Sequence, residues 1–346
     1  MKKLNNIQAL RGVAVIAVIF FHLVIIEAKY GGTQTLLPSW LSFGMFGVDL
    51  FFVISGFVMV TITRGKFQQA REALMFLYHR ASRIYPLYWV YTTLALIVFL
   101  IQPSWVNSSQ GSQVDIFSSY LLLPSLKLPL VQVGWTLIYE MYYYLVFFVI
   151  LFAVPEKFLV AAIFVWGGII AIFSSPTGGP AYYIVFNPLT IEFLAGCLIA
   201  VHFHNARQVR VNGFVLVTIA CLGMLAAILG YVQFMNLTGM YLEGWARLVY
   251  YGVPATIIVF CIVHAERNGT FLPSPLIQTG NASYSIYLSH LFTINAVGKV
   301  WNLFANDALL DNYIALCIAF ILSLIAGFIS YRFIELPLLS LSRKIA

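Results

Sequence analysis

Long apolar runs separated by short polar segments dominate this chain from end to end. Ten runs hold about the 20 residues that a helix needs to cross the hydrocarbon core of a bilayer. They cover residues 7–28, 44–63, 84–102, 134–153, 158–174, 182–203, 212–232, 245–264, 282–301 and 313–332. Because backbone groups must be satisfied internally in lipid, runs of this length indicate helices. The pattern predicts an all-α, polytopic membrane protein with about ten transmembrane helices.

The composition agrees with this class of protein. Hydrophobic residues make up 61% of the 346 residues and charged residues only 9%, whereas soluble domains carry about 25% charge. Mean hydropathy is +0.91. Since the apolar runs follow one another with short gaps, we expect residues 1–346 to form a single transmembrane domain without an appended extracytoplasmic domain. The first run is too long for a signal peptide and contains Arg11, so we expect it to remain as an anchor.

Lysine and arginine gather at one set of span ends, while the opposite loops hold few of them. The basic ends carry Lys2, Lys3, Arg64, Lys66, Arg71, Arg80, Arg83, Lys157, Arg207, Arg210, Arg267, Arg332, Arg343 and Lys344. The positive-inside rule then places both termini in the cytoplasm, in agreement with an even number of spans. The net charge of +7 reflects mainly this bias, so it does not indicate a nucleic-acid partner.

Ionisable side chains lie inside several spans, where they are costly and usually serve a function. Arg11 and His22 both fall in the first span. Eleven residues at about 100° each return to within about 20° of the starting direction, so both side chains share one side of the helix, about 16 Å apart along its axis. His22, Asp49 and Glu140 each lie about five or six residues below the outer edge, in one layer. The topology gives this depth but not which helices are neighbours.

A histidine beside a carboxylate suits proton transfer. Its imidazole can take a proton from a hydroxyl as a general base, while the carboxylate fixes its tautomer and stabilises the imidazolium. The alternative for His22 is a core histidine that hydrogen-bonds a neighbouring helix. For Asp49 alone, pairing of helices accounts for the residue as well as catalysis does. His290 lies near the middle of the ninth predicted span.

The predicted inner loop at residues 64–84 is basic and has two interpretations. It can contact anionic lipid, which is the usual reason for such charge. It can also hold the phosphates of a cytosolic nucleotide-containing donor. Arg80 and Arg83 are three residues apart and would share a helix face, and arginine binds phosphate in bidentate fashion.

Aromatic side chains crowd the outer end of the fourth predicted span. They are Trp135, Tyr139, Tyr142, Tyr143 and Tyr144. They fit either an interfacial aromatic belt or a surface for stacking sugar rings. No cluster of His, Cys or Asp has metal-ligand spacing, so we expect no metal.

Six motifs occur in order along residues 7–337. They are QALRG at 8–12 with His22 ten intervening residues further on, FGVDLFFVISGF at 46–57, RASRIYP at 80–86, WTLIYE at 135–140, GNASYSIYLSH at 280–290 and YRFIELP at 331–337. Together they make the chain resemble the membrane-bound acyltransferase family 3. The opening IQALR resembles exopolysaccharide O-acetyltransferases of the succinoglycan type. One departure is His79, where many members have another arginine.

The resemblance implies an enzyme that moves an acyl group, usually acetyl, from cytosolic acyl-CoA to a sugar hydroxyl of an exopolysaccharide or other surface glycan. It implies His22 as the central catalytic residue with Asp49 and Glu140 in support, Arg11, Arg80 and Arg83 as contacts for acetyl-CoA, and Trp135, Tyr139, Tyr143 and His290 as substrate contacts. It also implies the bacterial inner membrane, an acceptor that is a polysaccharide or a lipid-linked oligosaccharide, and partners in polysaccharide assembly. Many relatives carry an extracytoplasmic esterase-like domain, which we do not expect here.

Several alternatives stay open at this point. His22 would serve as a general base or carry the acetyl group transiently, since histidine is also a nucleophile. The acceptor could instead be a lipid or a small molecule. A proton-coupled transporter would use His22, Asp49 and Glu140 as a relay. Transporters often contain inverted repeats with paired broken helices, and we find no such pairing in the sequence.

Overall fold

The structure is a computed structural model that describes residues 4–107, 111–175, 178–205, 211–305 and 309–345. Every regular element in these ranges is a helix, which confirms the predicted all-α class. Lys2, Lys3, Arg207 and Arg210, which entered the charge argument above, lie outside the described residues. The chain divides into two compact units, residues 1–54 with 205–333 and residues 55–204 with 334–346. That residues 1–346 form one domain stays a prediction.

Nine helical stretches of the described residues are long and apolar enough to cross a membrane. They are Asn5–Tyr30, Ser39–Thr63, Ala70–Ile101, Gly134–Ala153, Glu156–Phe173, Pro180–Asn205, Gly213–Thr238, Gly244–Arg267 and Leu309–Ser342. They correspond to nine of the ten predicted spans. The other, residues 282–301, forms a 19-residue helix too polar for this group, because polar residues such as His290, Asn295 and Lys299 lower its hydropathy. Its crossing of the membrane and the cytoplasmic termini stay predictions.

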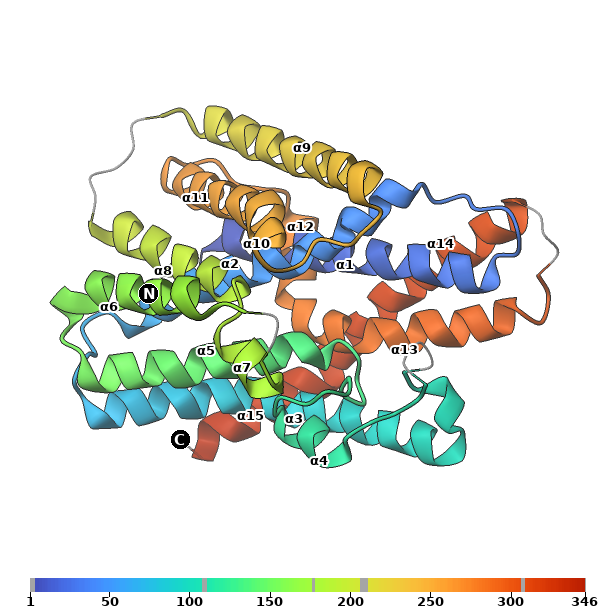
Figure 1. The fold of residues 1–346 in the computed structure, drawn as a ribbon, viewed down its shortest axis with the longest axis horizontal. Helices are drawn as coiled ribbons and strands as arrows, with labels where there is room; N and C mark the ends of the chain where they lie inside the picture. The colour runs from blue at the N-terminus through green and yellow to red at the C-terminus, as the bar shows by residue number, and fades with distance from the viewer. Residues whose placement is uncertain (1–3, 108–110, 176–177, 206–210, 306–308, 346) are drawn as a thin grey trace. The chain divides into compact units, whose positions relative to one another are not determined.

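The first unit is built around its N-terminal helix. Its helices are α1 (Asn5–Tyr30), η1 (Ser39–Met45), the first half of α2 (Phe46–Thr63), α9 (Gly213–Thr238), α10 (Gly244–Arg247), η5 (Leu248–Gly252), α11 (Val253–Arg267), α12 (Ser274–Asn281), α13 (Ser283–Trp301) and α14 (Leu309–Ser330). Helix α1 packs against η1, α11, α12, α13 and α14, while α9 lies along α11 and α13 along α14 (Figure 1). A helix surrounded in this way is apolar on most of its faces.

Close backbone packing joins α1 to α12. A Cβ atom placed at Gly280 would overlap the backbone oxygen of Gln8, and one placed at Gly12 would overlap the oxygen of Leu276. Small residues at such positions let two helices approach closely. Close packing matters here because lipid is itself apolar, so the hydrophobic effect contributes little to the association of helices in a membrane. The contact fixes the chain just before α13, the helix that carries His290.

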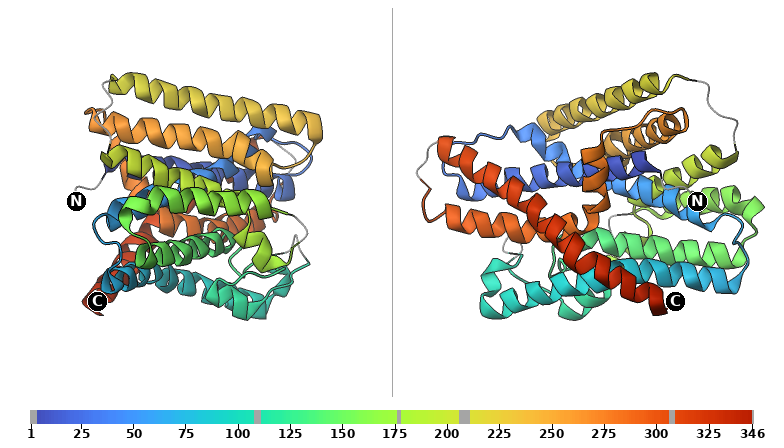
Figure 2. Two further views of the ribbon diagram at one scale, coloured as in Figure 1. Left: turned by 60° about the vertical axis from the view of Figure 1, so that its left-hand side comes forward. Right: turned by 180° about the vertical axis from the view of Figure 1, so that it is seen from behind.

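The second unit holds the central part of the chain and its C-terminal end. Its helices are the second half of α2, α3 (Ala70–Ile101), η2 (Pro103–Trp105), α4 (Ile116–Leu121), α5 (Gly134–Ala153), η4 (Glu156–Phe158), α6 (Leu159–Phe173), α7 (Pro180–Val185), α8 (Leu189–Asn205) and α15 (Leu336–Ile345). Helices α3 and α5 lie side by side (Figures 1 and 2). The Tyr78 hydroxyl on α3 donates to the Ser342 backbone oxygen on α15 at 2.8 Å. The π-helical turn η6 (Tyr331–Glu335) joins α14 to α15.

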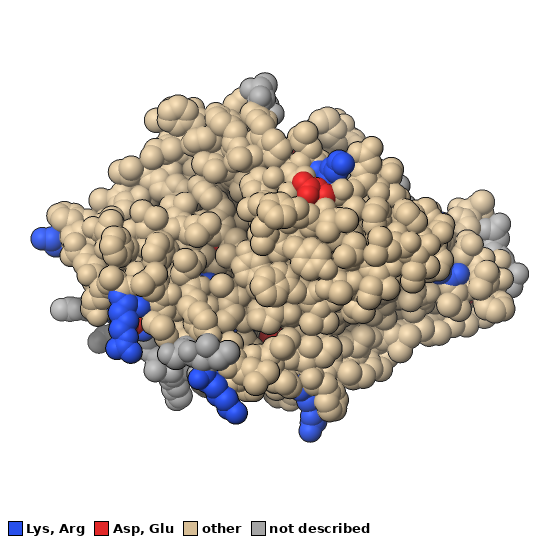
Figure 3. All heavy atoms as spheres, turned by 90° about the horizontal axis from the view of Figure 1, so that it is seen from below, with Lys and Arg blue, Asp and Glu red and all other residues tan. Residues whose placement is uncertain are grey.

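Helix α3 begins at Ala70, although the sequence predicted a loop to residue 84. The basic residues of this segment, Arg71, Arg80 and Arg83 among them, therefore lie on a helix. Run length finds only the apolar part of a helix, and the first turns of α3 are charged. The surface of the protein is otherwise largely uncharged on the face drawn in Figure 3. Exposed side chains such as Leu100 and Ile172 suit contact with lipid.

Candidate functional site

Two histidines meet in the first unit. His22 on α1 and His290 on α13 have ring centroids 4.9 Å apart, and Nε2 of His290 lies 3.2 Å from Nδ1 of His22. His290 is fully buried, whereas His22 is partly exposed. Arg11 lies on the same continuous helix as His22, so the predicted shared side holds, and its side chain is partly exposed.

The surroundings of His22 select its tautomer. Nδ1 lies 2.9 Å from the backbone oxygen of Val18, one helical turn earlier. A carbonyl oxygen only accepts hydrogen bonds, so Nδ1 carries the proton of the neutral ring. The lone pair then belongs to Nε2, and this atom makes no hydrogen bond within the described part of the chain. His22 thus presents an unprotonated ring nitrogen at a partly exposed position.

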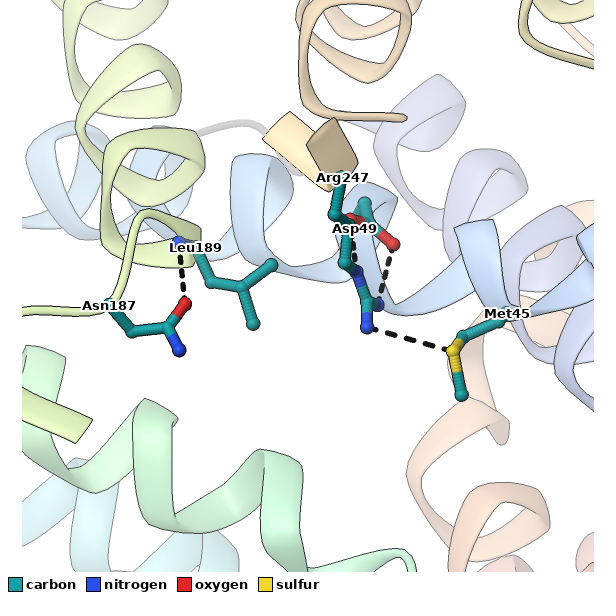
Figure 4. Close-up of polar contacts among 5 residues, drawn as sticks. All are labelled: Met45, Asp49, Asn187, Leu189 and Arg247. Carbon is teal, nitrogen blue, oxygen red and sulfur yellow. Dashed lines mark hydrogen bonds and ion pairs between the residues drawn. The ribbon is translucent and has the colours of Figure 1, made fainter. Parts of the chain in front are cut away.

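Asp49 has a different partner from the one expected. Nε of Arg247 donates to Asp49 Oδ1 at 2.9 Å, and Nη2 donates to Oδ2 at 2.8 Å (Figure 4). Asp49 is 0% exposed and Arg247 6%. Nη1 of Arg247 approaches the sulfur of Met45 at 3.6 Å. The carboxylate of Asp49 is therefore held by a bidentate ion pair, and none of its hydrogen bonds reaches His22.

Glu140 forms a polar group within the second unit. Its Oε1 accepts hydrogen bonds from the Ser55 hydroxyl at 3.0 Å and from the Tyr144 hydroxyl. The guanidinium of Arg80 lies over the ring of Tyr144, 6.0 Å from its centroid. Glu140 consequently anchors an aromatic ring that lies beside a basic residue of α3.

A cavity of about 450 Å³ opens beside Arg80. Its lining includes the basic side chains of Lys66, Arg71, His79 and Arg80, opposed by Glu72, together with apolar residues such as Phe76. Lys66 and Glu72 form an ion pair at 3.0 Å. Nε of Arg80 is buried and has no hydrogen-bond partner in the described residues. A buried donor of this kind is costly unless a ligand completes it.

The predicted sugar-binding aromatics pack mainly against one another. Tyr139 and Tyr143 are 3% and 0% exposed, and Trp135 is partly exposed. Trp135 meets Tyr139 edge-on at 6.0 Å, and Tyr143 stacks on Phe193 at 4.8 Å. Asn187, which precedes α8, donates to the Tyr139 hydroxyl at 3.0 Å. The side-chain oxygen of Asn187 accepts from the backbone N–H of Leu189 (Figure 4). Among these three aromatics, Trp135 is best placed to touch a substrate.

Sequence reasoning missed two partnerships of the first unit. Arg247, near the start of the predicted span 245–264, is the partner of Asp49. His290 was expected to contact substrate, and it contacts His22. These pairs join residues 198 and 268 positions apart, and only their shared ionisable character within apolar runs could have drawn attention to them.

The helices and these polar groups together indicate a class of protein. The nine apolar helices of the described residues make a multi-pass membrane protein. An unprotonated histidine nitrogen and a basic cavity suit a membrane enzyme of group transfer. The family model described as "Acyltransferase domain" (Acyl_transf_3) matches residues 4–332. The chain therefore belongs to acyltransferase family 3, as its motifs predicted.

Two relatives bear out this assignment. "Exopolysaccharide production protein ExoZ" of Rhizobium meliloti (strain 1021) is 29% identical over 317 residues, which cover 87% of this chain and 91% of ExoZ. "O-acetyltransferase OatA" of Staphylococcus aureus (strain NCTC 8325 / PS 47) is 25% identical over 381 residues, covering 97% of this chain and 57% of OatA. The chain thus spans little more than half the length of OatA. No solved structure matches it. The protein is an acyltransferase-family enzyme homologous to O-acetyltransferases.

Proposed function

We propose that this enzyme transfers an acetyl group from acetyl-CoA to a sugar hydroxyl of an exopolysaccharide or other surface glycan, at the bacterial inner membrane. The observation that carries the proposal is the contact of His22 Nδ1 with the Val18 oxygen, which assigns the ring proton to Nδ1 and leaves Nε2 without a hydrogen bond among the described residues. The family supplies the acyl transfer. The names of ExoZ and OatA support a glycan acceptor and an acetyl group, respectively.

In the proposed reaction His22 acts as a general base. The acceptor hydroxyl gives its proton to Nε2 as its oxygen bonds to the carbonyl carbon of the thioester. The tetrahedral intermediate then breaks the C–S bond, and the CoA sulfur takes the proton back from Nε2. The products are the acetyl ester and free CoA, with His22 neutral again. If His22 instead carried the acetyl group, the same Nε2 atom would bond to the carbonyl carbon as the C–S bond breaks and the CoA thiolate leaves. The acceptor hydroxyl would then displace His22 from the acetyl group and give its proton to the thiolate.

The basic cavity of the second unit would hold the phosphates of acetyl-CoA. Its volume of about 450 Å³ is in the usual range for ligand pockets, about 300–1,000 Å³. Arg80 offers a buried N–H without a partner, and a guanidinium binds phosphate oxygens with charge-assisted hydrogen bonds. Arg83 lies one helical turn further along α3 and would contribute to the same site. The contact of Arg11 with acetyl-CoA stays a separate prediction, because Arg11 lies on α1 in the first unit. Glu140 would support this site through the Tyr144 ring beside Arg80.

On the acceptor side, Trp135 would stack on the sugar, with Tyr139 and Tyr143 behind it. Asp49 would act through its ion pair with Arg247, which pairs α2 with α10. The acceptor would be a polysaccharide or a lipid-linked oligosaccharide. No metal is required by this scheme, because His22 supplies the base.

The test is the acetyl content of surface and secreted polysaccharide in a deletion strain complemented with wild type, His22→Ala or His202→Ala. His202 is an exposed histidine on α8 and serves as the matched control. We expect acetylation to disappear on deletion and to return with wild type and His202→Ala only. Full acetylation with His22→Ala would contradict the role of His22. Unchanged acetylation on deletion would contradict the glycan acceptor and point to a lipid or small molecule.

A second measurement separates the enzyme from a transporter. Membrane vesicles that contain the protein should release free CoA from acetyl-CoA only when an acceptor glycan is present. Proton-coupled uptake of a sugar without any dependence on acetyl-CoA would contradict the proposal.

A further inference from the structure

His290 has only one tautomer that fits its surroundings. Its Nδ1 lies 3.1 Å from the backbone oxygen of Ile286, one turn earlier on α13. Because that oxygen only accepts, Nδ1 of His290 carries the proton. Nε2 of the neutral ring then has a lone pair and can only accept a hydrogen bond. The atom it faces, at 3.2 Å, is Nδ1 of His22.

The Nδ1–H group of His22 therefore serves two acceptors. One is the oxygen of Val18 at 2.9 Å, and the other is Nε2 of His290. Three-centre hydrogen bonds, in which one N–H serves two acceptors, are a known arrangement in proteins and are common at helix termini. If the proton of His22 moved to Nε2, Nδ1 would carry a lone pair. That lone pair would face the Val18 oxygen and Nε2 of His290, which are both acceptors, and neither contact would be a hydrogen bond. Both contacts thus favour the tautomer that leaves Nε2 of His22 as the base.

The packing around His290 keeps its ring in place. His290 and Ile286 are both 0% exposed. A Cβ atom at Gly327 of α14 would overlap Ile286, so the two helices pack closely beside the carbonyl that orients the ring. The ring of Tyr287 lies 5.9 Å from that of His290. A fully buried acceptor is not exchanged for water, so its orientation is preserved.

We propose that His290 is a positioning residue, whose Nε2 accepts the Nδ1–H of His22 and so keeps Nε2 of His22 unprotonated toward the acceptor hydroxyl. When His22 takes the hydroxyl proton, the same hydrogen bond becomes charge-assisted and stabilises the imidazolium. This is the role that the sequence assigned to a carboxylate. It differs from the substrate contact expected for His290, and it rests on the proposed role of His22 as the base.

Two substitutions separate the hydrogen bond from the bulk of the ring. His290→Phe keeps an aromatic ring and removes the acceptor. His290→Gln places an amide oxygen near the position of the lost Nε2 and restores an acceptor. We expect His290→Phe to lower kcat for acetyl transfer about 10- to 100-fold, the range for a hydrogen bond to a charged group, with KM for acetyl-CoA unchanged. His290→Gln should recover most of the loss. His202→Phe is the control.

Nitrogen NMR of protein labelled with ¹⁵N-histidine, in lipid, reads the tautomer directly. The chain has six histidines, and the signal of His22 is assigned by its loss in His22→Gln. We expect wild-type His22 to have a protonated Nδ1 and an unprotonated Nε2, and His290→Phe to shift the population toward protonated Nε2. A protonated Nε2 in neutral wild-type His22 overturns the proposal, whether or not the variants fold.

The outcomes distinguish this inference from the proposed function. If His22→Ala retains acetyl transfer, both fall. If His22→Ala is inactive while His290→Phe keeps wild-type kcat and an unchanged His22 signal, the role of His290 falls and the proposed function stands. If His290→Phe is impaired and His290→Gln is impaired equally despite a folded protein, the acceptor role falls as well.

Discussion

The buried pair of Asp49 and Arg247 should behave as one unit in stability. The perturbations are Arg247→Met, Asp49→Leu and the double substitution. Both hydrogen bonds are short, at 2.9 and 2.8 Å, and the residues are 6% and 0% exposed. Two unit charges about 4 Å apart attract by about 4 kcal/mol at an effective dielectric constant of about 20. Removing one partner strands the other charge, and buried pairs broken in this way lose about 3–5 kcal/mol. The double variant removes both charges, so it should lie within about 2 kcal/mol of wild type.

The assay is unfolding of the purified protein in a single detergent, followed by circular dichroism and analysed as a double-mutant cycle. The control cycle uses Lys66 and Glu72, whose ion pair of 3.0 Å has side chains 47% and 34% exposed. Exposed pairs contribute about 0–1 kcal/mol, so Lys66→Met and Glu72→Leu should change stability little. The reasoning is refuted if either single substitution at the buried pair costs less than about 1 kcal/mol. It is also refuted if the double variant loses the sum of the two single losses.

Three further predictions concern the donor cavity, the α1–α12 contact and the outer loop. Arg80→Met should raise KM for acetyl-CoA about 10-fold or more with kcat largely kept, measured as initial rates over a range of acetyl-CoA; an unchanged KM would rule out a phosphate contact. Gly280→Ala should destabilise the protein by about 1–3 kcal/mol in thermal unfolding, because its Cβ overlaps the oxygen of Gln8, whereas Gly168→Ala on α6 meets nothing within 4 Å and should be neutral. The Ser118 backbone N–H donates to the carboxylate of Asp115 and holds the pKa of Asp115 below its ordinary value of 3.8. The cap of α4 is therefore present above that value and lost as pH falls through the folded pKa. The protection factors of the α4 amides, which compare exchange with the intrinsic rate at each pH, should fall in acid for wild type and stay level for Asp115→Asn.

Run length predicted the helices well, because the bilayer fixes the length of an apolar span. It failed for segments that are polar and nevertheless helical. The first turns of α3 are charged and still helical, since backbone hydrogen bonds do not require apolar side chains. Helix α13 fell short of the apolar group because it contains polar residues such as His290, Asn295 and Lys299, and several of its polar side chains are buried within the protein. Hydropathy reports on contact with lipid, and neither segment is defined by that contact.

The sequence could not show which helices are lateral neighbours, and the shared depth of its ionisable residues in the membrane stays a prediction. His22 and Asp49 were placed in one layer, yet their nearest charged or titratable partners proved to be His290 and Arg247. The π-helical turn η5 begins directly after Arg247. Such turns add a residue within a helix and frequently mark functional sites. Nothing in the local sequence distinguishes that turn from ordinary helix, so only the structure reveals the pair.

Ionisable groups buried in membrane helices need a partner or a ligand. Groups that the protein itself satisfies are expected to stabilise the fold, whereas groups that it leaves unsatisfied are candidates for chemistry. Glu27 is 1% exposed and accepts from the backbone N–H groups of Leu36 and Leu37 and from the amide of Asn312. Asp49 is likewise satisfied by Arg247. His22 differs, because its Nδ1 is held by neighbours while Nε2 makes no hydrogen bond among the described residues; we propose that this atom meets the substrate. Substitution of Asp49 should therefore first reduce stability, with turnover falling in proportion to folded protein. Substitution of His22 by Gln should abolish turnover at nearly unchanged stability, and an active, correctly folded His22→Gln enzyme would place the chemistry elsewhere.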